Sequence, residues 1–95
     1  MAYRISRKAE EDLLNIFRVG TQEYGLAHSE VYHAGLEQAF QFLSDYPRAA
    51  RERMEINPPV RAHRFKAHMI IYLIDGPDIL ILRVRHGRED WVSEP

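Results

Sequence analysis

The sequence has no cysteine, no long apolar run and little net charge. Without cysteine there is no disulfide framework, no thiolate zinc site and no cysteine nucleophile. No stretch approaches the ~20 apolar residues that cross a bilayer, and the opening Met1–Ser6 lacks the apolar core of a secretory signal. A net charge of -1 also differs from the strongly basic composition of a dedicated nucleic-acid binder. These absences favour a small cytoplasmic protein without a membrane segment.

Recognisable catalytic and ligand motifs are absent as well. The chain has no glycine-rich phosphate loop, no G-x-S-x-G nucleophile elbow and no H-E-x-x-H zinc motif. His63, His68 and His86 could in principle share a metal ion, but their spacing matches no common ligand pattern. We therefore expect no metal and no other cofactor.

What is present is the composition of one globular domain. The chain has 95 residues, of which 45% are hydrophobic and 28% are charged, and this size and mixture predict a single domain over residues 1–95. Residues 1–47 carry four Lys or Arg against seven acids, whereas residues 48–95 carry nine against seven. The second half therefore holds the cationic surface.

The first half of the chain predicts a strand and a helix. Tyr3 and Ile5 alternate with polar residues, as in a short strand. Ser6 is suited to cap a helix, and apolar residues recur at helical spacing over Ala9–Tyr24. Gly25 then provides a natural helix stop.

A second helix is predicted by the apolar spacing over Tyr32–Leu43, and it should end near Pro47 because the residue before a proline avoids the α conformation. A loop of two or three residues would join the two helices into an antiparallel hairpin. Each helix has one apolar stripe, so the hairpin needs another layer to cover it.

The second half of the chain predicts that layer. Residues 48–59 form a connector, with room for a short charged helix over Arg48–Glu55. Beyond it the apolar period changes to two, which predicts strands over Val60–Ala67, Met69–Ile74 and Asp78–His86. The expected fold is α+β, in the order β-α-α-β-β-β, with a small twisted antiparallel sheet packed against the helical hairpin.

The last strand is expected to separate two kinds of side chain, because successive residues of a strand point to opposite faces. The face toward the helices should carry Leu80, Leu82, Val84 and His86. The open face should carry Ile79, Ile81, Arg83 and Arg85. Such a face, apolar at one end and cationic at the other, could receive a partner or an anionic ligand.

Several basic residues could converge on one edge of this sheet, namely Arg61, Arg64, Lys66, Arg83, Arg85 and Arg88. Together they would bind a phosphate backbone or the acidic side chains of a partner. Alternatively, they are solvated charges that prevent aggregation between sheet edges. His86 could be a general acid or base, or a half-buried structural residue. Trp91 could be ordinary core, although an exposed aromatic residue in the tail Arg88–Pro95 would indicate an interface.

Taken in order, these residues resemble the ParE-like toxins of the RelE/ParE superfamily, which includes type II toxins and plasmid-stabilisation proteins. The resemblance covers nearly the whole chain, from the opening Tyr3–Ser6 through the hairpin loop Tyr24-Gly25. Its most specific part is Ile81–Trp91, which is similar to the family ending R-V-x-H-G-x-x-D followed by an aromatic residue or leucine.

The resemblance implies a growth-arresting toxin that a ParD-like antitoxin neutralises in a hetero-oligomer, with DNA contacted only through the antitoxin. RelE-like members of the superfamily cut mRNA in the ribosomal A site, whereas ParE-like members poison DNA gyrase by stabilising its cleaved-DNA complex. The nucleases usually carry an arginine three residues before the tyrosine of the central strand. Here Met69 stands three residues before Tyr72, and methionine cannot stabilise a developing phosphorane charge.

We therefore expect a gyrase inhibitor that acts by binding, with no catalytic residue. The residues expected to contact the target or the antitoxin are Arg61, Arg64, Arg83, Arg85, His86, Arg88 and Trp91. One alternative is a ribosome-dependent mRNA endoribonuclease that uses His86, Arg61 and Arg83. Another is a non-toxic remnant that acts only in the complex of antitoxin and operator.

Overall fold

The computed structural model describes residues 2–93, so Glu94 and Pro95 at the end of the tail lie outside the described residues. Its elements follow in the order β1 (Tyr3–Ile5), α1 (Arg7–Tyr24), α2 (Leu26–Asp45), β2 (Glu52–Arg53), β3 (Val60–Phe65), β4 (His68–Asp75) and β5 (Asp78–His86). The predicted α+β class is confirmed, with β2 as an added strand. No helix of this part of the chain is both long and apolar enough to cross a membrane.

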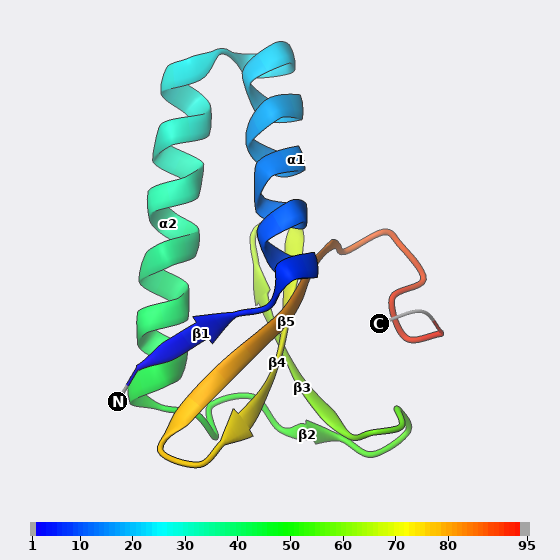
Figure 1. The fold of residues 1–95 in the computed structure, drawn as a ribbon. Coiled ribbons are helices and arrows are strands. Elements are labelled where there is room, and N and C mark those ends of the chain that lie inside the picture. Colours follow the sequence, from blue (N-terminus) through cyan, green and yellow to red (C-terminus); the bar gives the residue numbers. More distant parts are fainter. Residues whose placement is uncertain (1, 94–95) are drawn as a thin grey trace.

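The two helices form the predicted hairpin. The Ser6 hydroxyl caps α1 by accepting a hydrogen bond from the Ala9 backbone N–H at 3.1 Å, a contact that stabilises a helix by ~1 kcal/mol. Gly25 alone joins the helices, fewer residues than the expected loop, and its φ of 93° lies in the region that favours glycine. The hairpin stands over one end of the sheet and projects beyond it (Figure 1).

The sheet is mixed, with the strand order β1-β5-β4-β3-β2. β1 runs parallel to β5, and the other neighbouring pairs are antiparallel. The expectation of a wholly antiparallel sheet is therefore wrong at this one edge. Strand periodicity shows which residues are paired in space only for segments joined by a tight turn, and β1 is separated from β5 by the rest of the fold.

The connector contains β2 and not the short helix that its charges suggested. Glu52 pairs with Arg61, and Arg53 pairs with Val60. Backbone pairing with β3 gives these residues fixed partners, whereas an exposed helix of about two turns would be marginal in water.

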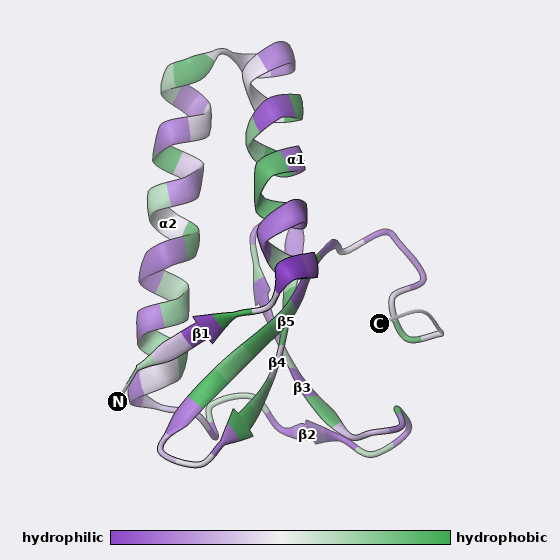
Figure 2. Ribbon diagram, viewed as in Figure 1, coloured by the Kyte–Doolittle hydropathy of each residue, from purple (hydrophilic) through white to green (hydrophobic). Residues whose placement is uncertain are grey.

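Apolar residues cover both faces of the sheet. The main core lies between the helices and the sheet and includes Leu36, Phe40, Ile70, Tyr72 and Ile81, each no more than 1% exposed. A smaller cluster on the other face contains Ile56, Val60, Ile71 and Trp91. The sheet separates the two clusters. Figure 2 shows that β5, one of its strands, is apolar in its middle. The expected open sheet face is therefore partly covered by the connector and the tail.

A β-bulge changes which residues of β5 face the helices. Ile81 pairs with Tyr72 and Arg83 pairs with Ile71, so Leu82 is an extra residue between two consecutive pairs. Ile79 and Ile81 therefore belong to the main core, and Leu82 packs on the opposite face. The predicted alternation is wrong for this first half of β5, because a bulge shifts the register by one residue. It is confirmed for Val84, which lies in the main core.

Candidate functional site

A groove of about 580 Å³ lies between the helical hairpin and the end of the sheet at which β4 begins and β5 ends. The residues that line it include Ile16, Tyr32, Leu36, His68, Val84 and His86. Its volume falls within the ~300–1,000 Å³ of ordinary ligand pockets. The hairpin projects beyond this end of the sheet (Figure 1). It combines apolar side chains from both helices with polar groups from β4, β5 and the tail.

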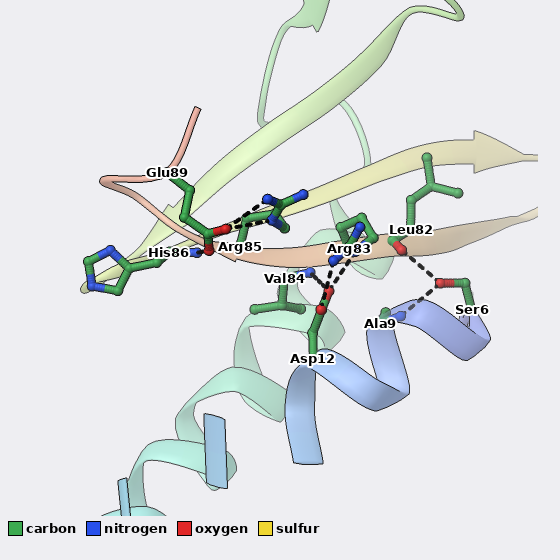
Figure 3. A network of polar contacts seen from close by, with 9 residues as sticks. All are labelled: Ser6, Ala9, Asp12, Leu82, Arg83, Val84, Arg85, His86 and Glu89. Atoms are coloured by element: carbon green, nitrogen blue, oxygen red, sulfur yellow. Dashed lines mark hydrogen bonds and ion pairs between the residues drawn. The ribbon is translucent and has the colours of Figure 1, made fainter. Parts of the chain in front are cut away.

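The carboxylate of Asp12 ties α1 to the edge of β5 along this groove. It accepts hydrogen bonds from Nε and Nη2 of Arg83, at 2.8 and 2.9 Å, and from the Val84 backbone N–H at 3.0 Å (Figure 3). These hydrogen bonds raise the pKa of the Arg83 guanidinium. β1 pairs only with the first part of β5, so Asp12 satisfies a backbone donor that would otherwise face the open edge.

The residue that caps α1 also bonds to β5, at the bulge. Ser6 Oγ donates to the Leu82 carbonyl at 2.7 Å while it caps α1 through the Ala9 N–H (Figure 3). One hydroxyl therefore fixes both the start of α1 and the irregular part of β5.

A compact turn follows β5 and is organised by Glu89. Its carboxylate accepts hydrogen bonds from the Arg85 guanidinium, the shorter at 2.7 Å, and from the His86 backbone N–H at 2.9 Å (Figure 3). The bonds from Arg85, together with that from the His86 backbone, hold the pKa of Glu89 below its ordinary value. The Arg88 backbone N–H then donates to His86 Nδ1 at 3.1 Å.

Five aromatic rings line up along the groove, in the order Tyr24, His28, Tyr32, His68 and His86. The distances between successive ring centroids are 4.8, 6.1, 5.5 and 5.3 Å. The Tyr32 hydroxyl lies 2.6 Å from His68 Nδ1. Burial, with a smaller contribution from His86, lowers the pKa of His68, so its imidazole is neutral at pH 7.

The predicted basic residues do not converge on one edge. Arg64 and Arg85 flank Met69 on neighbouring strands, on the face away from the helices. Arg61 pairs with Tyr72 on the helix side and donates to the Ala50 carbonyl at 2.7 Å. Arg61 and Arg64 are three residues apart on one strand, and this odd spacing places them on opposite faces.

The remaining members of the predicted set are equally dispersed. The Lys66 ammonium lies over the rings of Tyr32 and Phe65, at 5.8 and 5.5 Å from their centroids. Arg83 is held by Asp12, whereas Arg88 is exposed in the turn. Two of the predicted arginines, Arg64 and Arg85, still lie on one face of the sheet, and Arg88 follows in the adjacent turn. We call these three residues the outer arginine surface. A Cβ at Gly87 would approach the Arg64 guanidinium to 3.1 Å.

Trp91 is buried, at 7% exposure, which agrees with the core alternative and not with an exposed aromatic residue in the tail. It packs into the cluster on the outer side of the sheet, with the Arg53 guanidinium 5.2 Å from its ring centroid. The tail folds back over the sheet because Ile56, Val60 and Ile71 would otherwise leave an apolar surface exposed.

Sequence reasoning missed the two carboxylates that organise the site. No local pattern pairs Asp12 with Arg83, which lies 71 residues away in the sequence. Glu89 stands four residues after Arg85, a spacing that could have indicated their ion pair. Among residues 2–93, no group of three or more possible ligands could hold a metal ion.

Comparisons with known proteins agree on one family. Residues 3–91 match the family described as the ParE toxin of the type II toxin–antitoxin system parDE. Toxin ParE3 of Caulobacter vibrioides is 30% identical over 89 residues, covering 94% of this chain and 89% of the relative. Toxin ParE of Escherichia coli is 31% identical over 93 residues, covering 97% and 90%.

A solved structure described as a chromosomal ParDE TA system from P. aeruginosa has the same fold. It superposes with a TM-score of 0.78 at 20% sequence identity, over 90% of this chain and 95% of that chain.

Proposed function

This chain belongs to the ParE toxin family of type II toxin–antitoxin systems, and from that premise we propose that it acts by binding, with DNA gyrase as its target. On this proposal, the toxin stabilises the complex of gyrase with cleaved DNA and so blocks replication. A ParD-like antitoxin neutralises it.

The observation that carries a binding mechanism is the separation of the residues that a nuclease would use. Arg61 lies beside Tyr72, whereas His86 lies beside His68, which pairs with Phe65. Arg61 and Phe65 are four residues apart on β3, or ~13 Å along the strand. A general acid and an anion-binding cation must both reach one phosphate, whereas the Arg61 guanidinium already donates to the Ala50 carbonyl.

The two other groups that a nuclease could recruit already have structural roles. The Arg83 guanidinium is bidentate to Asp12. Tyr72 is fully buried, and its hydroxyl donates to the Pro47 carbonyl at 2.8 Å. Burial raises the pKa of Tyr72, which further opposes a role in proton transfer.

The outer arginine surface supports contact with a macromolecular target. Arg64 and Arg85 flank Met69, and Arg88 is exposed in the adjacent turn. Arginine is enriched in binding hot spots, and an apolar side chain between cations suits a protein surface with acidic residues.

The groove supports antitoxin binding at a different place. Ile16, Val19 and Leu36 contribute its apolar lining, and a groove with apolar walls suits the apolar face of an amphipathic helix. The structural neighbour is itself described as a ParDE system, which supports a ParD-like partner for this chain. DNA would then be contacted only through that partner.

Two parallel assays test the proposed target. Purified toxin is incubated with gyrase, ATP and supercoiled plasmid, and separately with mRNA on programmed ribosomes. We expect linear plasmid after denaturation of gyrase, and intact mRNA. Arg88→Glu should weaken gyrase poisoning at least tenfold, whereas the matched reversal Lys8→Glu on exposed α1 should retain it. Cut mRNA with intact plasmid overturns the proposal, and no effect in either assay indicates a non-toxic remnant.

A further inference from the structure

The outer face of α2 carries an uncharged stripe that the fold leaves exposed. Positions that recur every three or four residues share one face of a helix, and five such positions along α2 are exposed, namely Ala27, Val31, Ala34, Gln38 and Phe42. We call these five residues the α2 stripe. Val31 is 69% exposed and Phe42 is 44% exposed. α2 packs through its other side, where Leu36, Phe40 and Leu43 enter the main core.

The solvent face of α1 is different. Its exposed positions carry mainly charged side chains, including Arg7, Lys8, Glu10, Glu11, Arg18 and Glu23. Leu14 is 71% exposed, but Glu10, Glu11 and Arg18 stand three or four positions away on the same face. A single exposed apolar residue is ordinary on a protein surface, whereas a continuous apolar patch marks an interaction site. The α2 stripe is continuous from Ala27 to Phe42, over ~22 Å at the rise of ~1.5 Å per helical residue.

Acidic residues follow one edge of the α2 stripe. Glu30 and Glu37 are exposed and seven residues apart, so they lie two turns apart along the same edge. α2 contains no Lys or Arg, and His33, 3.8 Å from Glu37, is charged only when it is protonated. Two cations lie near the helix but off this edge, Lys66 in the β3–β4 turn and Arg48 beyond the C-terminal end of α2. The edge of the stripe is therefore negatively charged.

These charges distinguish a second copy of this chain from a different partner. Two antiparallel α2 stripes would bring their acidic edges together, and like charges that face each other oppose association. Two parallel stripes would leave both acidic edges without a cation. A helix with Lys or Arg along one edge of its own apolar stripe supplies that cation, because residues that flank the seam of a helix pair interact across it.

We propose that the α2 stripe is a docking surface for an amphipathic helix of another protein, one that carries basic residues beside its apolar stripe. The apolar side chains of that helix pack against Val31, Ala34 and Phe42, while its Lys or Arg side chains lie opposite Glu30 and Glu37. The apolar contact provides affinity, and the charges provide specificity and orientation. The groove is lined by other residues of α2, so this inference does not depend on the proposed function.

Two synthetic helical peptides test the surface. Both have the same seam of Leu and Ala over three heptads, and the flanking positions carry Lys in one peptide and Glu in the other. Fluorescence anisotropy of the labelled peptides with the purified chain should show saturable binding of the Lys peptide, at least tenfold tighter than that of the Glu peptide. Added salt should reduce the difference, because it screens exposed charges. No binding of the Lys peptide, or equal binding of the two peptides, overturns the proposal.

A pair of matched variants locates the binding. Val31→Gln should weaken binding of the Lys peptide at least fivefold, because it places a polar group in the apolar contact. Leu14→Gln, at an equally exposed position of α1, should stay within twofold. Glutamine is a good helix former, so both variants keep the fold, and thermal unfolding verifies this. Equal effects of the two substitutions would place the peptide elsewhere and contradict the docking surface.

A charge exchange tests the role of the acidic edge. Glu30→Lys/Glu37→Lys should reverse the preference, so that the Glu peptide binds more tightly than the Lys peptide. Glu10→Lys/Glu11→Lys changes the net charge equally and should leave the preference as it is. An unchanged preference in the α2 double variant overturns the proposal, as does a dimer of the chain alone that Val31→Gln dissociates in sedimentation velocity. Neither antitoxin nor gyrase takes part, so failure here leaves the proposed function standing.

Discussion

At the scale of single residues, the carboxylate of Asp12 has a structural role outside the core. It is 16% exposed and accepts three hydrogen bonds from β5. Arg83 was predicted as a free contact residue, but this ion pair makes it part of the fold. Replacing Arg83 should therefore reduce the stability of the fold more than it reduces binding to a partner.

Asp12→Ala should lower the free energy of unfolding by about 2–3 kcal/mol, because it leaves Arg83 and the Val84 N–H without their acceptor. Urea denaturation measures the change. Glu11→Ala, the exposed neighbour on α1, should change stability by less than ~0.5 kcal/mol. Equal effects of the two substitutions would contradict this role of Asp12.

The neutral imidazole of His68 makes stability depend on pH. Its folded-state pKa is below its ordinary value of 6.5 because of burial, so the unfolded chain binds the proton more tightly. The free energy of unfolding should therefore fall as pH decreases from 7.5 to 5.5. His68→Gln should flatten this dependence in urea denaturation across that range. The lowered pKa values of Glu89 and Glu55 act at more acidic pH.

At the scale of elements, α2 approaches the sheet through a glycine. A Cβ at Gly35 would lie 2.6 Å from the tip of the Phe65 ring. Gly35→Ala should gain ~1 kcal/mol of helix propensity and lose ~1–3 kcal/mol to overpacking, so we expect net destabilisation.

The double variant Gly35→Ala/Phe65→Leu tests this reason. Shortening the ring removes the clash, so the alanine should become less harmful than it is beside Phe65. Thermal unfolding of the four members of the cycle measures the coupling. Additive effects would exclude the contact as the cause.

Local signals explain which elements could be predicted. The Ser6 cap, the helical spacing and Gly25 act within a few residues, and they located the helices. The bulge at Leu82 and the parallel partner of β1 depend on residues far away in the sequence, so strand alternation could not show them. The same limit applied to the site, because Asp12 and Arg83 meet only in the folded chain.

At the scale of the whole molecule, histidines and exposed arginines gather on different surfaces. The groove is lined by His28, His33, His68 and His86. Arg64 and Arg85 flank Met69 on the face away from the helices, although Arg85 also borders the groove. Antitoxin and target can therefore contact different places on the toxin, and charge reversal should separate their effects.

Arg64→Glu and Arg88→Glu should each weaken gyrase binding at least tenfold and leave the melting temperature within a few degrees. Arg18→Glu, on exposed α1, should change neither quantity. Surface plasmon resonance and thermal unfolding provide the two measurements. A loss of gyrase binding in Arg18→Glu that equals the loss in Arg88→Glu would remove the outer arginine surface from the proposal.

Antitoxin binding should also stabilise this small fold. A partner that binds only the folded toxin, at 1,000 times its dissociation constant, adds about 4 kcal/mol, which corresponds to at least ~15 °C in the melting temperature of a domain of this size. Calorimetry of the toxin alone and of the copurified complex tests this. An unshifted transition, with complex formation verified independently, contradicts antitoxin binding to the folded chain.

The pairing of β1 with β5 also determines when toxicity can begin during synthesis. Tyr3 finds its sheet partner only at Ile79, so a ribosome must make nearly the whole fold before its first strand has a neighbour. The helical hairpin emerges early, but the surfaces that cover its apolar stripes and build the groove come last. At ~5–20 residues per second, synthesis of the chain takes seconds, and the antitoxin's binding groove is complete only at the end of that time. Capture can thus begin as soon as the groove closes, before the finished toxin diffuses to its target.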